Sequence, residues 1–199
     1  AYADEMKLLF LGDVMGRSGR AAVVARLPTL RTAWALDFVV VNGENATGGL
    51  GLSPEHAKAL LGAGADCITL GDHAFDQKEM TSFIESEPRI IRPLNYARAA
   101  PGRGARVFDA RGGRRVLVAQ ALGRVFMKQP FDDPFSAVDQ VLLAGALEHE
   151  ALVGHHVGTA DLVDTGRAIE VPGGEQVGDH VVDADRRGTQ RRIARGTQR

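Results

Sequence analysis

Three short apolar runs, each leading into a polar cluster, limit the possible folds of this chain more than any other feature. The runs are Lys7–Leu11, Asp37–Val41 and Asp66–Leu70, and the clusters are Gly12-Asp13, Asn42-Gly43-Glu44-Asn45 and Gly71-Asp72-His73. Short, continuous apolar runs are typical of strands that are buried on both faces. We therefore interpret each run as a buried strand.

Helical patterns lie between and after these runs. Helical spacing covers Gly19–Trp34, and Ser53-Pro54-Glu55 begins a second helix with a serine N-cap, a proline at N1 and an acid in the first turn. Further helices are predicted over Gln77–Glu85 and Ser136–Leu147, and a hairpin over Arg106–Asp109 and Arg115–Ala119. Crossovers of ten or more residues imply parallel pairing, so the predicted class is α/β with a mostly parallel sheet covered on both faces.

Size and composition fit one folded domain. The chain has 199 residues, of which 44% are hydrophobic and 25% charged, and this is enough to bury a core. Its apolar runs are far shorter than the ~20 residues that span a bilayer, and its acidic start does not resemble a signal peptide. A single cysteine, Cys67, fits a reducing cytoplasm. The net charge of −1 argues against a nucleic-acid-binding surface. We expect a cytoplasmic protein that contacts neither membrane nor nucleic acid.

The last part of the chain carries weaker patterns. Strand and helix signals thin out beyond about Val157, and six of the 24 basic residues are arginines within 186–199. The pentapeptide Arg187–Arg191 is repeated as Arg195–Arg199, which is typical of a disordered tail, with an RNA-binding arm as the alternative interpretation. We therefore divide the chain into a domain over 6–161, an irregular segment over 162–185 and an arginine-rich tail over 186–199.

The polar clusters at the strand ends are the candidate functional residues. Ligands of open α/β sheets bind outside the carboxyl ends of the strands. The residues that could meet there are Asp13, Asn42, Glu44, Asn45, Asp72 and His73, and a later pair, His155 and His156, adds two imidazoles. Carboxylate oxygens with imidazole nitrogens favour Mn²⁺, Fe²⁺ or Zn²⁺ over Ca²⁺. A carboxylate that bridges two such ions, flanked by histidines, is the layout of a two-metal phosphoester hydrolase.

Each cluster also has a purely structural interpretation. A Gly-Asp pair after a strand is commonly a turn or a helix N-cap, and Asn42-Gly43 is a common turn pair. His155 and His156 are neighbours, and neighbours alternate between the faces of a strand, so only an irregular loop would let both reach one site. The segment Gly16–Arg20 resembles a phosphate-binding loop, but it lacks the Walker lysine and hydroxyl pair.

The order of the clusters is more specific than any one of them. The segments are Met6–Arg20, Val41-Asn-Gly-Glu-Asn-Ala46, Gly71-Asp-His-Ala-Phe-Asp-Gln-Lys-Glu79 and Asp132-Asp-Pro-Phe135. Over Met6–Phe135, about two thirds of the chain, the sequence closely resembles the bacterial YmdB-like metallophosphoesterases, a branch of the calcineurin-like phosphoesterase superfamily. The resemblance implies a metallophosphoesterase-like α/β sandwich.

The resemblance also implies an activity and a set of roles. It implies a phosphodiesterase of cyclic nucleotides such as 2′,3′-cyclic AMP, with two divalent ions of Fe, Mn or Mg. Asp13 matches a metal ligand, Glu44 matches the carboxylate that bridges the two ions, and Asp72 takes the place of a ligand asparagine. Asn45 matches a residue that either contacts substrate or supports a metal ligand. His73 matches a histidine that contacts phosphate or protonates the leaving oxygen. The implied partner is a small phosphodiester, and self-association into a homo-oligomer stays open.

The second half departs from the family pattern. His149 loosely matches the first of two later histidine motifs, and His155 and His156 match the second, from which an intervening threonine is missing. These three are the remaining implied metal ligands. The family pattern is not recognisable after Asp161, so we expect the C-terminal part of the domain to be incomplete. We also expect at most two of the three imidazoles to reach the site, and one metal position to be weak or empty.

The leading prediction is a divalent-metal phosphodiesterase. The alternative is a catalytically weak or inactive homologue that binds a nucleotide or a protein partner. Histidine ligands in place would favour the enzyme, and their absence from the site would favour the binding protein. Asp72 adds a negative charge where the family has an amide, which should strengthen cation binding and repel an anionic phosphate.

Overall fold

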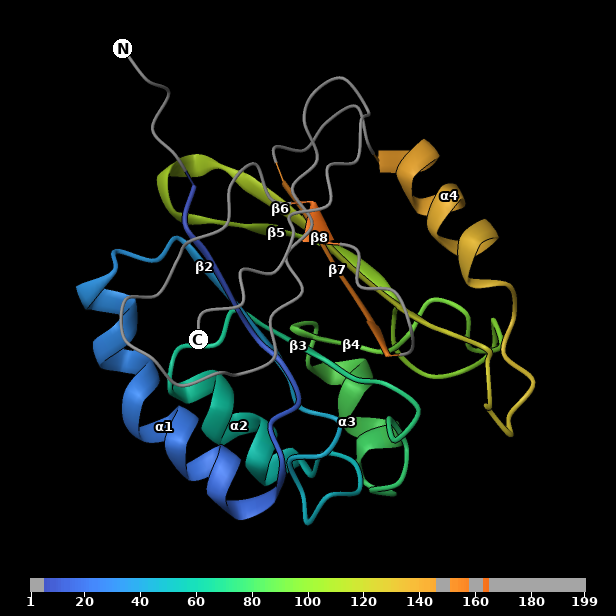
Figure 1. Cartoon of the computed structure of the whole chain (residues 1–199), viewed down its shortest axis with the longest axis horizontal. Helices are drawn as coiled ribbons and strands as arrows, with labels where there is room; N and C mark the ends of the chain where they lie inside the picture. Colours follow the sequence, from blue (N-terminus) through green and yellow to red (C-terminus); the bar gives the residue numbers. More distant parts are fainter. Residues whose placement is uncertain (1–5, 146–150, 158–162, 165–199) are drawn as a thin grey trace, which may run out of the picture.

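The strands of the protein form two four-stranded sheets (Figure 1). The computed structural model describes residues 6–145, 151–157 and 163–164. Within these residues the first sheet has the order β1-β2-β3-β4 and the second the order β5-β6-β7-β8. His149, the arginine-rich tail and the segment 162–185, apart from residues 163–164, lie outside the described residues. The proposed division of the chain there stays a prediction.

The first sheet is entirely parallel. It consists of β1 (Leu8–Leu11), β2 (Phe38–Asn42), β3 (Cys67–Thr69) and β4 (Ile90–Ile91). The first three confirm the strands predicted from the apolar runs. β2 and β3 are buried as predicted, whereas β1 is only half-buried because it lies at the edge of the sheet. The fourth was not predicted, because two isoleucines after a Pro-Arg pair give no periodic signal, and their burial depends on pairing with β3.

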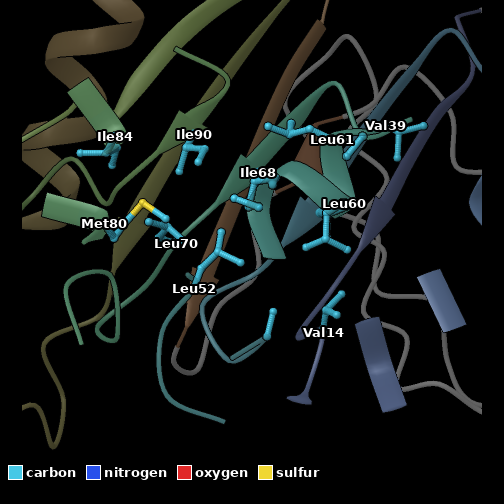
Figure 2. Close-up of a cluster of buried hydrophobic side chains, with 14 of the residues drawn as sticks. Val14, Val39, Leu52, Leu60, Leu61, Ile68, Leu70, Met80, Ile84 and Ile90 are labelled. Carbon is cyan, nitrogen blue, oxygen red and sulfur yellow. The ribbon is translucent and has the colours of Figure 1, made fainter. Parts of the chain in front are cut away.

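Three helices cover one face of the first sheet. They are α1 (Gly16–Ala33), α2 (Pro54–Gly62) and α3 (Met80–Ser86). Their apolar side chains pack on Val39, Val41 and Ile68 in one core cluster, part of which is drawn in Figure 2. The Ser53 hydroxyl accepts a hydrogen bond from the His56 N–H, as its predicted N-cap role requires.

The second sheet is mixed. β5 (Ala105–Asp109) and β6 (Arg115–Leu122) form the predicted antiparallel hairpin, joined through the 3-10 turn η1 (Arg111–Gly113). A parallel strand, β7 (Ala151–Val157), pairs with β6, and a short strand, β8 (Val163–Asp164), runs antiparallel to β7. The helix α4 (Pro134–Gly145) lies between β6 and β7 in the sequence and contacts β6.

The two sheets pack face to face. Phe38, Val40, Cys67 and Ile91 of the first sheet share a core cluster with Phe108, Val116 and Val118 of the second. The rings of Phe38 and Phe108 lie 5.5 Å apart between centroids. The first sheet is therefore covered by helices on one face and by the second sheet on the other, which confirms the predicted α/β sandwich.

The space between the sheets changes from apolar to polar toward the carboxyl ends of the strands. Side chains alternate along a strand, so Asn42, Thr69 and Gln120 follow Val40, Cys67 and Val118 on the inward faces. All three are buried, and we call them the polar layer. The polar layer therefore lies near the carboxyl ends of the strands, where the candidate site is expected.

No helix within the described residues is both long and apolar enough to cross a membrane.

Candidate functional site

The loops after β1, β2 and β3 meet at one edge of the first sheet, as parallel strands require. Backbone hydrogen bonds join them: the Val14 N–H donates to the Asn42 oxygen at 3.0 Å, and the Gly43 N–H donates to the Thr69 oxygen at 3.0 Å. The predicted clusters around Asp13, Glu44 and Asp72 therefore lie on neighbouring loops of the same edge.

Asp13 and Asn45 contact each other across this edge. The Asn45 amide donates to Oδ1 of Asp13 at 2.7 Å. Asp13 is exposed and its backbone has a φ of 43°, in the left-handed region that aspartate tolerates better than most residues. The carboxylate is thus held at the surface of the site by a loop from the neighbouring strand.

Glu44 is the buried carboxyl group of the site. Its side chain is 3% exposed, and Oε1 accepts a weak hydrogen bond from the Asn42 amide at 3.5 Å, whereas Oε2 has no partner. Burial, and then the charge of Asp72, raise the pKa of Glu44 from its ordinary 4.5 to about 7, although the N–H of His73 acts in the opposite direction. A buried acid with an oxygen left unpaired is ready to accept a cation.

Gly71 makes room for the Glu44 carboxylate. A Cβ added at Gly71 would lie 1.8 Å from Oε2 and 2.3 Å from Cδ of Glu44, far inside any normal contact. The close approach of the β3 loop to the acid therefore requires glycine at this position.

His73 lies between two carboxylates. Its Nδ1 lies 2.6 Å from Oδ2 of Asp76, and its Nε2 lies 3.9 Å from Oδ2 of Asp72. Burial by itself would lower the pKa of His73, but the hydrogen bond to Asp76 and the nearby negative charges raise it overall. The contact to Asp76 orients the ring, so that Nε2 is the nitrogen available to a substrate.

Two residues of this environment were missed by the sequence analysis. Asp76, within the segment quoted for the family resemblance, was not recognised as the partner of His73. The Tyr96 hydroxyl donates to the backbone oxygens of Gly71 and Asp72, which lie 3.1 Å away each, and so holds the loop after β3 in place. Its position 24 residues away from that loop gave no signal, because the contact exists only in the folded protein.

The described residues fit a divalent cation only in part. The carboxylate oxygens of Asp13, Glu44 and Asp72 are the hard ligands that such a cation prefers. Two buried oxygens, Oε2 of Glu44 and Oδ1 of Asn42, have no hydrogen-bond partner. In the described part of the chain, however, no three histidine, cysteine, aspartate or glutamate side chains are grouped closely enough to hold a metal ion. The shared site of these three carboxylates therefore stays a prediction.

Two of the three later histidines, His155 and His156, lie in β7. The ladder with β6 continues without interruption, and it pairs His155 with Gln120 and His156 with Ala121. The irregular loop that both would need to reach one site is not found, and His149 lies outside the described residues.

Known proteins with similar sequences and folds indicate a family for this chain. A 2′,3′-cyclic-nucleotide 2′-phosphodiesterase of Bacillus subtilis is 39% identical over 141 residues, which cover 71% of this chain and 53% of the relative. A crystal structure of a hypothetical protein from Thermus thermophilus matches at 40% identity and a TM-score of 0.67, over 77% of this chain and 59% of that chain. A phosphatase structure from Mycoplasma pneumoniae matches at 30% identity and a TM-score of 0.69, over 78% and 57%.

The matched region covers most of this chain but only part of each relative. The chain spans about half the length of the curated relatives that it matches. Residues 9–161 match the YmdB-like protein family, a range that contains every candidate site residue from Asp13 to His156. The chain belongs to the YmdB-like protein family.

Proposed function

We propose that the protein is a divalent-metal phosphodiesterase that hydrolyses cyclic nucleotides such as 2′,3′-cyclic AMP through a two-metal site. The observation that carries the proposal is Glu44: a carboxyl group that is 3% exposed, next to Asp72 and with one oxygen unpaired. Burying such a group is costly unless a cation or proton compensates it. The Bacillus subtilis relative, named as a 2′,3′-cyclic-nucleotide 2′-phosphodiesterase, supports the substrate class.

The chain's own residues divide into metal ligands and substrate contacts. The proposed ligands of two Fe, Mn or Mg ions are Asp13, Glu44, Asp72, His149, His155 and His156. Divalent ions in this position neutralise phosphate charge and activate water as a nucleophile. Asn45 contributes an amide beside Asp13, where it can contact a phosphate oxygen.

His73 is the proposed general acid. Its raised pKa keeps more of the ring protonated, and the contact of Nδ1 with Asp76 leaves Nε2 to face the substrate. When water attacks phosphorus and one ribose oxygen leaves, that oxygen takes the proton from Nε2. Asp76 is a positioning residue in this step, because it acts only through the imidazole.

The second candidate function is a homologue that binds nucleotide with little or no turnover. It is supported by the uninterrupted ladder of β7, which lacks the irregular backbone that His155 and His156 would both need to reach one site, and by the extra charge at Asp72. The first feature weakens a two-metal site built on adjacent histidines, and the second repels an anionic phosphate.

Turnover by manganese-loaded protein distinguishes the two. The assay uses bis-p-nitrophenyl phosphate and 2′,3′-cyclic AMP, with Glu44→Gln as the test variant and Glu55→Gln, an exposed acid in α2, as the matched control. The phosphodiesterase proposal requires turnover in the wild type and in Glu55→Gln, and its loss in Glu44→Gln. Nucleotide binding without turnover in all three proteins would establish the second candidate.

A further inference from the structure

The loop after β2 presents one apolar side chain to solvent beside the candidate site. Among residues 48–51 only Leu50 carries a side chain, and it is 54% exposed. The φ angles of Gly48, Gly49 and Gly51 are 64°, 84° and 77°, in the left-handed region that glycine adopts without strain. The loop therefore follows a path that suits glycine, and Leu50 supplies its side-chain surface.

Hydrogen bonds fix the backbone of Leu50 on both sides. Its N–H donates to the Thr47 oxygen at 3.1 Å, and its oxygen accepts from the side-chain amide of Gln77 at 2.6 Å. Gln77 belongs to the segment that follows His73, so this contact joins the loop after β2 to the loop after β3. The anchored backbone keeps Leu50 at the surface instead of letting it turn into the core.

A second exposed apolar side chain, Met15, lies against the same loop. Met15 is 49% exposed, and it follows Asp13 by two residues at the start of α1. Its Sδ lies 3.4 Å from the position that a Cβ would occupy at Gly49, the residue before Leu50. Met15 therefore joins Leu50 on the Asp13 side of the site.

The loop also adjoins the segment that carries the proposed general acid. A Cβ added at Gly51 would lie 3.0 Å from the His73 oxygen and 3.1 Å from the backbone nitrogen of Gln77. The loop that carries Leu50 thus contacts Met15 on one side and the backbone of His73 on the other. A substrate bound at the proposed metal centre would have this apolar pair beside it.

We propose that Met15 and Leu50 are specificity-determining residues that contact the base of the nucleotide substrate, and that they favour purines over pyrimidines. This inference rests on the proposed function. An exposed apolar pair gains free energy when a flat ring covers it, and a methionine sulfur adds a favourable contact with an aromatic ring. A purine covers more apolar surface than a pyrimidine does, which gives the preference its direction.

The first test observes the two side chains directly in metal-free protein. Protein with ¹³C-labelled methionine and leucine methyl groups is titrated with 2′,3′-cyclic AMP. The methyl signals of Met15 and Leu50 should move upfield and saturate, because the ring current of a base that lies over them shields them. The methyl group of Met80, which is fully buried, is the internal control and should not move. Inorganic phosphate, which has no ring, should cause no upfield shift. Signals of Met15 and Leu50 that do not respond to the nucleotide overturn the inference.

The second test separates base recognition from the reaction in manganese-loaded protein. Met15→Ala and Leu50→Ala should each raise KM for 2′,3′-cyclic AMP about tenfold, the lower end of the range for a lost apolar contact, because the pair is open to solvent. The kcat should not change, since this binding is the same in the ground state and the transition state. The ratio of kcat/KM for 2′,3′-cyclic AMP to that for 2′,3′-cyclic CMP should fall toward one.

A matched control and a second pair of variants keep this test decisive. Val24→Ala, at an exposed apolar position further along α1, should leave both KM and the purine preference unchanged. If an alanine variant does not fold, Met15→Gln and Leu50→Asn, which keep the size of the side chain and replace its apolar end by an amide, should give the same result. A KM and a purine preference equal to those of the wild type in the Met15 and Leu50 variants overturn the inference.

The two proposals fail in different ways. Turnover of 2′,3′-cyclic AMP with the same KM in the wild type and in the Met15 and Leu50 variants would refute the inference and leave the proposed function standing. Saturable methyl shifts at Met15 and Leu50 in a protein that shows no turnover with manganese would retain the base contact and refute the proposed phosphodiesterase activity.

Discussion

Replacing Gly71 by alanine should remove the Glu44 carboxylate from its place in the site. The new Cβ would lie 1.8 Å from Oε2, 2.3 Å from Cδ and 2.4 Å from Oε1 of Glu44. A contact of at least 3.0 Å therefore requires the carboxylate to retreat by more than about 1 Å, in surroundings that are already closely packed. Overpacking of this kind costs about 1–3 kcal/mol of unfolding free energy.

The metal should respond more strongly than the fold. A ligand displaced by about 1 Å no longer meets the geometry that a metal site needs, so we expect Mn²⁺ affinity to fall at least tenfold. The measurements are urea unfolding of the metal-free protein and calorimetric titration with Mn²⁺. Gly62→Ala is the matched control, because no atom lies within 4 Å of its Cβ position at the end of α2. It should leave Mn²⁺ affinity unchanged and gain up to about 1 kcal/mol in stability.

A second substitution separates the clash from other effects. Glu44→Asp shortens the acid by one methylene, so the Gly71→Ala/Glu44→Asp double variant should recover part of the lost stability. Wild-type stability and wild-type Mn²⁺ affinity in Gly71→Ala would refute the close approach of the β3 loop to the acid.

Three further predictions follow from the same contacts. In metal-free protein the raised pKa of Glu44 means that folding takes up a proton between pH 4.5 and about 7. The free energy of unfolding should therefore fall by up to about 3 kcal/mol as the pH rises through that range. Urea unfolding across the range should show this fall in the wild type and not in Glu44→Gln. Tyr96→Phe removes the hydroxyl that donates to Gly71 and Asp72 and should cost about 1 kcal/mol, and an unchanged urea midpoint would contradict it. Asp72→Asn should raise kcat/KM for anionic phosphodiesters in manganese-saturated protein because it removes a like charge, and an equal or lower kcat/KM would count against this.

Local sequence patterns predicted the elements whose burial can be recognised from their own residues. The apolar runs before Asp13, Glu44 and Asp72 became β1, β2 and β3 because short, mostly apolar segments fit strands of a parallel sheet that is covered on both faces. The cap at Ser53 and the hairpin of β5 and β6 were also predicted, since each depends on residues close together in the sequence.

Features that depend on distant contacts were not predicted. β4 contains only Ile90 and Ile91, and it is a strand because β3 supplies its hydrogen bonds. The parallel pairing of β7 with β6 spans about 35 residues, and no local pattern reveals it. The start of α1 at Gly16, rather than Gly19, is likewise set by the Asn45 oxygen, which accepts from the Gly16 N–H.

The site was predicted as a set of residues and not as a set of contacts. The strand-end rule brought Asp13, Asn45, Glu44 and Asp72 to one edge because parallel strands end together. The roles of Asp76 and Tyr96 emerged only from the fold, since their partners are fixed by the path of the loop after β3. The burial of Glu44 also depends on a distant glycine, Gly71.

The number of manganese ions bound per chain tests the central claim most directly. Calorimetric titration of metal-free protein with Mn²⁺, together with metal analysis after dialysis, should show one firmly bound ion and a second, weaker one in the wild type. Both should be lost in Glu44→Gln, because the proposed bridging carboxylate serves both ions, and both should persist in Glu55→Gln. Manganese binding that is the same in Glu44→Gln as in the wild type would contradict the account.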